Sequence, residues 1–368
     1  MEVSVQTVAP KITSISLGGV AALIDNENSR ILVNNLPFNI TSSYSAKSSD
    51  ITDLTRVEVT SLETSEGASA NVSVGSILDV SFGTATITVA NGSESKTYKV
   101  KGGYQYPNSD FSNWKNGSDG YTQLDGWDNG NNSFSSGLAA KATDEGRTVN
   151  KMTSVTVNVV FVEKCAGGNS FTADFNPNNV KAINMASYDD GNELIDFGKP
   201  FAGRPEYIEF DAKYVGKGDS CDMYIILENR SGGPDVTNKN RNGSVNKMVA
   251  SAWYRATSIT NSPNRPVPDL VSVGQIERSG YSTVRLKLQY GAPLNNSPIF
   301  NSRVLNTVAT SLKHKDGIDN RLTPIEASEA ETLPVTHIRI VIASSAKGNE
   351  YKGVTGATLY VDEIRLIY

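Results

Sequence analysis

The sequence predicts an all-β protein made of two β-sandwich domains. Short runs rich in β-branched residues recur along the chain, and glycine- and proline-containing turns separate them. Within these runs apolar and polar residues alternate, as expected for strands that bury one face. The length of 368 residues exceeds what one small sandwich needs and suits two domains.

The first predicted domain, residues 1–102, is an immunoglobulin-like sandwich. Asn91-Gly92 stands between its last two strands and is a strong hairpin signal, because both residues tolerate positive φ. The domain contains no His, Cys or Trp, so we expect it to act as a spacer. Its strands are expected over residues 11–17, 30–36, 55–61, 84–90 and 96–102.

The second predicted domain, residues 103–368, is a larger jelly-roll sandwich. Its closing strand runs to Tyr368, and the apolar phase of this strand slips at Asp362-Glu363. Either a β-bulge lies there, or this is a central strand that is apolar on both faces. Clear alternation predicts further strands over residues 153–163, 206–214, 282–290 and 336–344.

Helix signals are few. Thr323 and Glu326 have the spacing of a capping box, and Pro324 would occupy the first helical position. These residues predict a short helix that extends to about Glu331. Apolar residues at helical spacing predict one or two turns within residues 302–313.

The charge balance argues against nucleic acid as a partner. The formal net charge is −5, the isoelectric point is near 5.3, and no basic stripe with interleaved aromatic residues is present. No window is apolar enough for a membrane helix, and the start of the chain lacks a signal-peptide h-region. We expect an exported, extracytoplasmic protein that acts as a monomer. Contact with the membrane would occur only through a lipid anchor that this chain does not contain.

Five stretches of the second predicted domain form a recognisable set when they are taken in their order. They are Phe111–Asn131, Gly167–Phe175, Phe197–Tyr214, Cys221–Glu228 and Ile338–Tyr368. The set resembles the "putative carbohydrate metabolism domain" family of surface lipoproteins from gut bacteria, over about residues 104–368. The resemblance implies a jelly roll similar to carbohydrate-binding modules, a location at the cell surface or outer membrane, and a role near polysaccharide uptake.

Tryptophans beside amide side chains are the first candidates for sugar binding. Sugar rings pack on aromatic faces, and Asn129 and Asn131 beside Trp127 could bind ring hydroxyls. The alternative is that Trp127 fills the core and the Asn-Gly steps form turns. Trp253 and Tyr254 are adjacent and so point to opposite faces of a strand. We expect one of the two in the core and the other exposed for stacking.

Arg204 precedes a proline and therefore lies in extended backbone. Its guanidinium group could bind a sugar hydroxyl or a uronate carboxylate. The alternative is a structural salt bridge to Glu206 or Asp211.

Paired carboxylates are the candidates for catalysis. Glu209 and Asp211 lie on one strand face, about 7 Å apart from the strand rise, and glycosidases use two facing carboxyl groups. The alternative is a solvated surface pair, neutralised by Lys213. No cofactor is expected. A structural calcium ion would suit Asp189, Asp190 or Asp362, whereas solvated turns are the alternative.

The sequence thus predicts non-catalytic glycan binding in polysaccharide capture. Two other functions stay open. One is a glycoside hydrolase or lyase that uses the carboxylates, and the other is a structural or adhesion protein of the cell surface.

Overall fold

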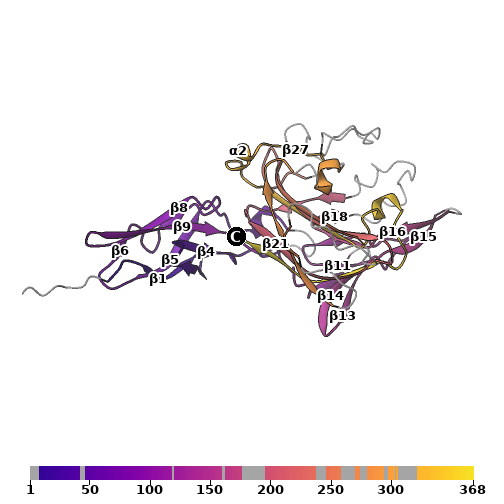
Figure 1. The fold of residues 1–368 in the computed structure, drawn as a ribbon, viewed down its shortest axis with the longest axis horizontal. Coiled ribbons are helices and arrows are strands. Elements are labelled where there is room, and N and C mark those ends of the chain that lie inside the picture. The colour runs from indigo at the N-terminus through magenta and orange to yellow at the C-terminus, as the bar shows by residue number, and fades with distance from the viewer. Residues whose placement is uncertain are drawn as a thin grey trace, which may run out of the picture.

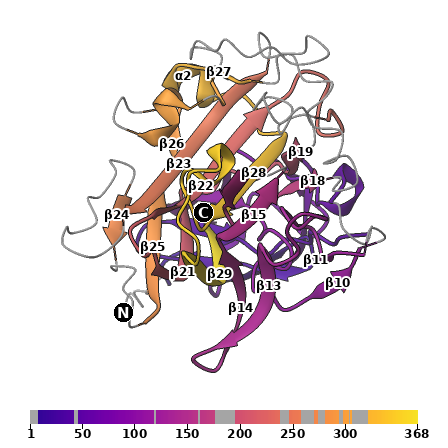
Figure 2. The same ribbon diagram turned by 90° about the vertical axis from the view of Figure 1, so that its right-hand side faces the viewer.

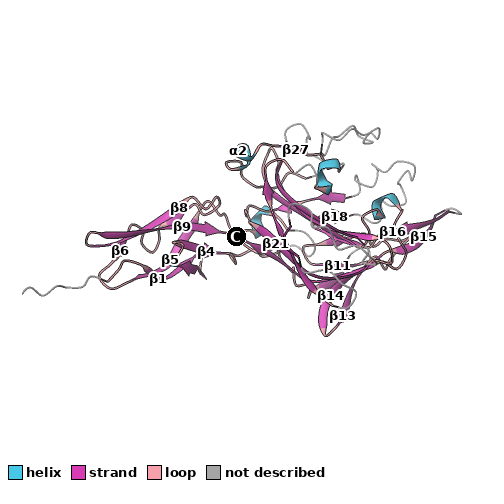
Figure 3. Ribbon diagram, viewed as in Figure 1, coloured by secondary structure: helices cyan, strands magenta, loops and turns pink. Residues whose placement is uncertain are grey.

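The computed structural model describes residues 8–41, 46–117, 120–159, 162–175, 195–237, 246–257, 270–273, 280–293, 297–302, 304–305 and 321–368. Strands dominate these residues (Figure 3), which confirms the predicted all-β sandwich class. None of the helices among them is long and apolar enough to cross a membrane. Both cysteines, Cys165 and Cys221, are free.

The N-terminal part is a sandwich of two small sheets, drawn in indigo and purple in Figure 1. Gly92, with φ of 60°, turns the chain between β8 (Ala85–Asn91) and β9 (Glu94–Gly102), as the sequence predicts. One sheet has the order β2 (Val20–Ala21), β1 (Ile12–Leu17), β5 (Val57–Thr64), β7 (Ile77–Leu78). The other has the order β3 (Leu23–Asp25), β4 (Arg30–Val33), β9 (Glu94–Gly102), β8 (Ala85–Asn91), β6 (Ser69–Ala70).

The C-terminal part is built on two larger sheets. The six-stranded sheet has the order β13 (Ala139–Asp144), β14 (Arg147–Thr153), β29 (Thr358–Ile367), β21 (Tyr207–Val215), β25 (Ser282–Lys287), β24 (Leu270–Val273). The eight-stranded sheet has the path β12 (Asp128–Asn129), β17 (Asn169–Phe171), β28 (His337–Ala343), β22 (Ser220–Asn229), β23 (Lys247–Thr257), β26 (Gln289–Tyr290). In addition, β20 (Lys199–Pro200) pairs with β28, and β27 (Thr323–Pro324) pairs with β23.

Three short hairpins and several helical turns complete the described structure. The hairpins are β10 (Trp114–Asn116) with β11 (Thr122–Leu124), β15 (Val155–Val159) with β16 (Val162–Ala166), and β18 (Ala173–Phe175) with β19 (Ile195–Phe197). The turns are η1 (Ser48–Asp50), η4 (Pro298–Asn301), α2 (Ala327–Ala330) and η5 (Gly348–Glu350).

The inner faces of the two large sheets pack into one core. The predicted alternation is confirmed on β21, where Ile208, Phe210 and Ala212 are fully buried. Ile225 on β22 and Val249 on β23 belong to the same apolar cluster from the opposite sheet. Because alternate residues of each strand enter this core, the remaining residues of β22, β23 and β28 face away from it.

The closing strand β29 contains a bulge, one of the two alternatives that the sequence leaves open. Asp211 on β21 pairs with Glu363, whereas the next residue, Ala212, pairs with Val361. Asp362 is therefore the extra residue of a bulge. The bulge lets both Val361 and Ile364 point into the core, which explains the slip in the apolar phase.

The helix predicted over residues 323–331 is wrong in where it begins: it starts later in the chain. Thr323-Pro324 instead forms β27, in which Thr323 pairs with Lys247. Helix α2 covers only Ala327–Ala330, and its N-cap, Glu326, makes no side-chain cap bond. Sheet pairing thus overrides the local capping pattern. Most of the helix predicted within 302–313 lies outside the described residues.

The two parts share one continuous apolar core at their junction. Phe38 and Tyr104 meet edge to face with ring centroids 5.2 Å apart, and Tyr104 meets Phe201 at 5.0 Å. Glu206 accepts from both Arg30 and Lys101, each at 3.2 Å. The junction between the two sandwiches is therefore a packed interface.

Candidate functional site

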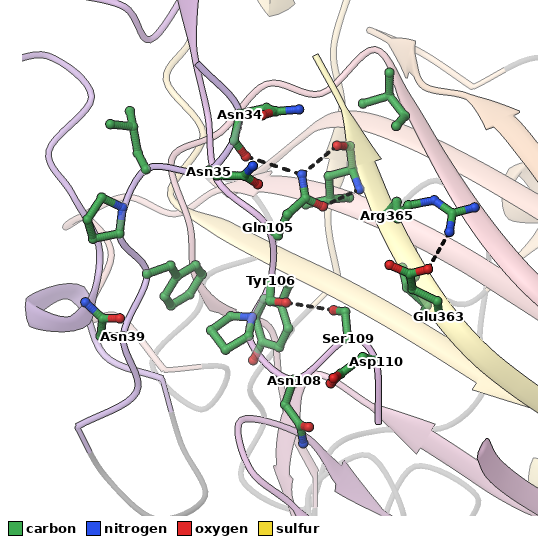
Figure 4. A pocket seen from close by; sticks show the side chains of 17 residues that line it. Asn34, Asn35, Asn39, Gln105, Tyr106, Asn108, Ser109, Asp110, Glu363 and Arg365 are labelled. Atoms are coloured by element: carbon green, nitrogen blue, oxygen red, sulfur yellow. Dashed lines mark hydrogen bonds and ion pairs between the residues drawn. The ribbon is translucent and has the colours of Figure 1, made fainter. Parts of the chain in front are cut away.

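A pocket of about 570 Å³ opens where the two sandwiches meet (Figure 4). Three segments line it: 34–39 from the N-terminal sandwich, 105–110 from the connection, and 363–367 from β29. Pockets at such junctions are frequent ligand sites, and this volume suits a small molecule or a few units of a polymer.

Hydrogen bonds hold the three walls together before any ligand arrives. The Gln105 amide donates to the carbonyl oxygens of Asn34, at 3.3 Å, and Leu366, at 2.8 Å. Its side-chain oxygen accepts from the Leu366 N–H at 2.7 Å (Figure 4). The Ile364 N–H donates to the carbonyl oxygen of Ser109 at 2.9 Å. The pocket is thus largely preorganised.

Three carboxamides of the pocket wall have no hydrogen-bond partner among the described residues: the side chains of Asn34, Asn35 and Asn39. Asn34 is half-buried, whereas Asn35 and Asn39 are exposed. A carboxamide both donates and accepts hydrogen bonds. The wall can therefore bind a ligand with many hydroxyl groups.

The charges at the rim are largely tied to one another. Arg365 binds Glu363 at 2.5 Å, Glu209 at 3.0 Å and Asp211 at 3.3 Å. Burial opposes the charge of Arg365, but hydrogen bonds to Glu209 and Asp211 outweigh it and raise its pKa. Asp110, the other carboxylate at the pocket, accepts from Ser112. The rim therefore favours an uncharged ligand.

A second unusual surface is the outer face of the eight-stranded sheet, where β22, β23 and β28 run side by side (Figure 2). Tyr224 and Trp253 are register partners there, stacked with centroids 4.0 Å apart and planes 20° apart. The neighbouring pair, Arg255 and Asp222, forms two hydrogen bonds of 2.7 and 2.8 Å.

A charged cluster lies on the same outer face. Glu228 is fully buried and binds both Arg230, at 2.9 Å, and Arg339, at 2.8 Å. The guanidinium group of Arg339 also lies 4.9 Å from the ring centroid of Phe197. Burying such a cluster is unfavourable unless each charge is paired.

Asp128 lies at the far edge of this sheet and is held as a structural group. Its carboxyl accepts from the Gln123 amide and from the N–H groups of Asn129 and Phe175, at 2.7 to 2.9 Å. Burial raises the pKa of Asp128 to about 7.

The prediction that Trp127 stacks on a sugar is wrong for this structure. Trp127 is fully buried, and its ring meets Tyr106 and Phe111 edge to face. Its Nε1–H donates to the carbonyl oxygen of Pro107 at 3.0 Å. No face of the ring is free, so the alternative, a core position, holds.

Asn129 and Asn131 also have structural roles. The Asn129 amide donates to the carbonyl oxygen of Thr122, and the Asn131 amide donates to that of Ala139. Both residues are 1% exposed. Their predicted role in binding sugar hydroxyls is therefore wrong, because the backbone uses these groups.

Trp253 and Tyr254 do point to opposite faces of β23. Tyr254 enters the core between the sheets, and Trp253 enters the separate apolar cluster on the outer face. The expectation that one ring is exposed is wrong: Trp253 is 6% exposed and Tyr254 is fully buried. Trp253 nevertheless lies on the outer face described above.

Arg204 is a structural residue, but not through the salt bridge considered from the sequence. Its guanidinium group donates to the carbonyl oxygens of Ala330, the last residue of α2, and Leu333, at 2.6 and 2.9 Å. It lies between the rings of Phe82 and Tyr290, 4.8 and 4.7 Å from their centroids. It therefore fastens α2 to the junction.

Glu209 and Asp211 share a face as predicted, but arginines neutralise them. Glu209 binds Arg285 at 2.6 Å, and both carboxylates bind Arg365. Lys213, the predicted neutraliser, binds Asp144 and Glu145 instead.

The calcium candidates divide into two groups. Asp362 pairs with Arg147 at 2.6 Å, which occupies one of its oxygens. Asp189 and Asp190 lie outside the described residues. Within the part of the chain that the structure describes, no three His, Cys, Asp or Glu side chains gather to hold a metal ion.

Sequence reasoning missed the most suggestive residues of both surfaces. Asn34 and Asn35 fall within the strand predicted over residues 30–36, but β4 ends at Val33 and both residues line the pocket. Tyr224 lies in a strand with apolar residues on both faces, so its sequence context does not single it out.

Comparison with known proteins gives distant structural likenesses. No family model matches the chain, and no curated protein matches it. A crystal structure reported as a "putative glycoside hydrolase" from Bacteroides thetaiotaomicron VPI-5482 has a TM-score of 0.42 and 18% identity, covering 100% of this chain and 99% of its own. A second structure, reported in the same words, comes from Bacteroides vulgatus ATCC 8482. It has a TM-score of 0.40 and 15% identity, and the match covers 69% of this chain and 89% of that one. At such scores the function must be argued from the residues themselves.

Proposed function

We propose that this protein binds a neutral glycan, without catalysis, in the pocket between its two sandwiches. The observation that carries the proposal is the set of three carboxamides, Asn34, Asn35 and Asn39, that line a preorganised pocket without partners among the described residues. Sugar hydroxyls need neighbours that can both donate and accept, and carboxamides do both. The rings of Phe38 and Tyr106 add apolar contact.

The proposal makes the N-terminal sandwich part of the binding site. That sandwich supplies the three asparagines, while the C-terminal part supplies Glu363 and Arg365. Because the junction is packed, the two walls keep their relative position, and little ordering is required when ligand binds.

The charges of the pocket favour binding over hydrolysis. A glycosidase needs one carboxyl group that can donate a proton and a second carboxylate across the scissile bond. Glu363 is paired with Arg365, and Asp110 is bound by Ser112. We therefore place the protein among non-catalytic components of polysaccharide capture at the bacterial surface, as the resemblance to the carbohydrate metabolism domain family implies.

The test is a glycan-array screen of the purified chain, with and without calcium, followed by titration of each hit. We expect binding to a neutral polysaccharide. The double variant Asn35→Ala with Asn39→Ala should weaken it about tenfold, since each lost hydrogen bond contributes about 0.5–1.5 kcal/mol.

A matched control removes two exposed asparagines of the same sandwich that do not line the pocket, Asn28 and Asn71. This Asn28→Ala, Asn71→Ala variant should bind as the wild type does. An array without neutral hits, or hits that both variants bind equally well, would contradict the proposal. Release of reducing ends from a bound polysaccharide would show catalysis instead.

A further inference from the structure

Two carboxylates on the wall of the junction pocket each keep one oxygen without a hydrogen-bond partner among the described residues. Asp110 is exposed, and only its Oδ1 accepts, from the N–H and the hydroxyl group of Ser112 at 3.3 and 3.1 Å. The side chain of Glu363 is 42% exposed, and only its Oε2 accepts, from Arg365 at 2.5 Å. Asp110 Oδ2 and Glu363 Oε1 are therefore available to a ligand.

The backbone of the connection holds Asp110 in a fixed place. Asn108 and Phe111, both with φ of 53°, stand on either side of it. The Phe111 N–H closes a turn on the Asn108 carbonyl oxygen at 3.1 Å. A bulky residue such as Phe111 rarely adopts this left-handed conformation, so packing must hold it there. Its ring is fully buried against Trp127, with ring centroids 5.5 Å apart.

Glu363 comes from β29 and meets this turn at the pocket. The Ile364 N–H donates to the carbonyl oxygen of Ser109 at 2.9 Å, which joins the two segments. Asp110 and Glu363 are the next residues along these segments. In Figure 4 they lie on one side of the view, and the labelled asparagines of segment 34–39 lie on the other. A ligand in the pocket thus has carboxamides on one side and carboxylates on the other.

The charged side chains that line the pocket are Asp110, Glu363 and Arg365, and their charges sum to −1. The guanidinium group of Arg365 is not reserved for the pocket, since it also binds Glu209 and Asp211 on β21. The wall therefore carries more negative than positive charge.

Two cations next to the wall have partners of their own. Arg285 binds Glu209 at 2.6 Å, and the Nζ of Lys141 donates to the carbonyl oxygen of Ser112 at 2.8 Å. When both cations are counted together with Glu209 and Asp211, the set comprises four carboxylates and three cations, and the sum is still −1. The neighbouring charges thus leave the pocket unfavourable for an anion.

The chemistry of these carboxylates both attracts and excludes ligands. An ionised carboxylate only accepts hydrogen bonds, and a sugar hydroxyl group can donate one. A hydrogen bond to a charged acceptor is roughly twice as strong as one between neutral groups. The same carboxylates repel an anionic ligand, because like charges placed together weaken binding. Specific sites discriminate by combining two such effects.

We propose that Asp110 and Glu363 are the specificity-determining residues of the junction pocket. Their available oxygens accept hydrogen bonds from the hydroxyl groups of a neutral sugar ring. Their charge excludes rings that carry a carboxylate or a sulfate group. This role rests on the proposed function, since it concerns the ligand of the same pocket.

The test titrates the full chain with neutral trisaccharides and with their uronate counterparts, which have the same linkage but carry carboxylates in place of hydroxymethyl groups. The pairs are cellotriose with triglucuronate, mannotriose with trimannuronate, and galactotriose with trigalacturonate. We expect the wild type to bind the neutral member of at least one pair about tenfold more tightly than the uronate member.

The variant Asp110→Asn with Glu363→Gln keeps the shape of both side chains and removes both charges. It should weaken binding of the neutral trisaccharide about tenfold, because two charge-assisted hydrogen bonds become ordinary ones. It should bind the matching uronate more tightly than the wild type does, because the like charges are gone. The ratio of neutral to uronate affinity therefore falls. A purely structural role would weaken both ligands together and leave this ratio unchanged.

A matched control removes two exposed carboxylates of the N-terminal sandwich that do not line the pocket. Asp79→Asn with Glu94→Gln changes the net charge by the same amount. Asp79 accepts from the N–H and the hydroxyl group of Ser81, so it also matches the local setting of Asp110. This control should keep both affinities of the wild type.

Equal affinity of the wild type for both members of a pair, or an unchanged ratio in the Asp110→Asn, Glu363→Gln variant, would overturn this role. If Asn35→Ala, Asn39→Ala weakens neutral binding and the carboxylate variant changes neither affinity, the proposed function stands and only this role fails. If no trisaccharide binds, or only uronates bind, the proposed function fails as well.

Discussion

The indole nitrogen of Trp127 donates a hydrogen bond to the carbonyl oxygen of Pro107 at 3.0 Å. This bond fixes a fully buried ring within the aromatic-rich segment that leads into the second sandwich. The sequence around Trp127 has the composition of a sugar site, yet its Asn and Trp side chains serve the fold.

Trp127→Ala should destabilise the protein by about 3–5 kcal/mol, because it leaves a large cavity and an unpaired carbonyl group. Urea unfolding followed by circular dichroism measures this. Trp114 is only partly buried, so Trp114→Ala should cost clearly less and serves as the comparison. A stable Trp127→Ala protein that has lost only glycan binding would contradict the core role.

Arg204 should be important for stability at the junction. Burial lowers the pKa of Arg204, and its charge is held by two carbonyl groups and two rings. Arg204→Ala should cost about 2–4 kcal/mol, since it leaves these carbonyl groups unpaired and removes the packing of the guanidinium group. The stability of Arg204→Lys should lie between that of the wild type and that of Arg204→Ala, because an ammonium group lacks the planar fork of donors that a guanidinium group has.

Equal unfolding free energies for the wild type and Arg204→Ala, measured in urea, would show that the contacts of Arg204 add nothing. Native-state proteolysis provides a second measurement. We expect faster cleavage near α2 in Arg204→Ala, since the arginine binds one carbonyl group at the end of this helix and one just beyond it.

Asp128 should make stability depend on pH between about 4 and 7. Its folded pKa of about 7 lies above the ordinary value for an aspartate. The folded state thus binds a proton that the unfolded state has released. The contribution of Asp128 is fully present below the unfolded pKa and is lost as pH rises through 7. The loss is on the order of 4 kcal/mol.

Asp128→Asn removes this titration and is the variant to compare. The difference in unfolding free energy, wild type minus Asp128→Asn, should fall between pH 4.5 and pH 8. Denaturant unfolding at both pH values measures it. A difference that is the same at both would mean that Asp128 titrates as an ordinary carboxyl.

The bulge at Asp362 should be dispensable for the facing of the core residues. Deleting Asp362 would leave Val361 and Ile364 two positions apart, the spacing at which two side chains of a regular strand point to the same face, so both would still enter the core. We expect the deletion variant to fold. Asp362→Ala removes only a surface pair with Arg147 and should cost less than about 1 kcal/mol.

Circular dichroism and thermal unfolding of the two Asp362 variants measure this contrast. A deletion variant that fails to fold would contradict this expectation and would mean that β29 needs the bulge itself. A large loss in Asp362→Ala would instead place the effect in the ion pair.

The strands could be predicted because their signals are local. Alternation along residues 206–214 predicts which residues of β21 are buried, since the strand period of two is fixed by the backbone. The same rule shows the phase slip at Asp362-Glu363, but only the pairing of β29 with β21 decides that a bulge causes it. That Thr323 lies in a strand rather than at a helix start could not be predicted, because its strand partner, Lys247, lies 76 positions earlier in the chain.

The sequence by itself determined an all-β chain, its strand positions and the facing of residues within most strands, because alternation and turn chemistry act over a few residues. Only the tertiary structure decided which polar groups are free. The side chains of Asn129, Asn131 and Arg204 bind backbone carbonyl groups, whereas those of Asn34, Asn35 and Asn39 have no hydrogen-bond partner among the described residues. The physical reason is that a hydrogen-bonding group is available for a ligand only when the fold brings no partner to it. Only the folded backbone decides this, whether the carbonyl group lies 7 or 8 positions away, as for Asn129 and Asn131, or more than 100, as for Arg204.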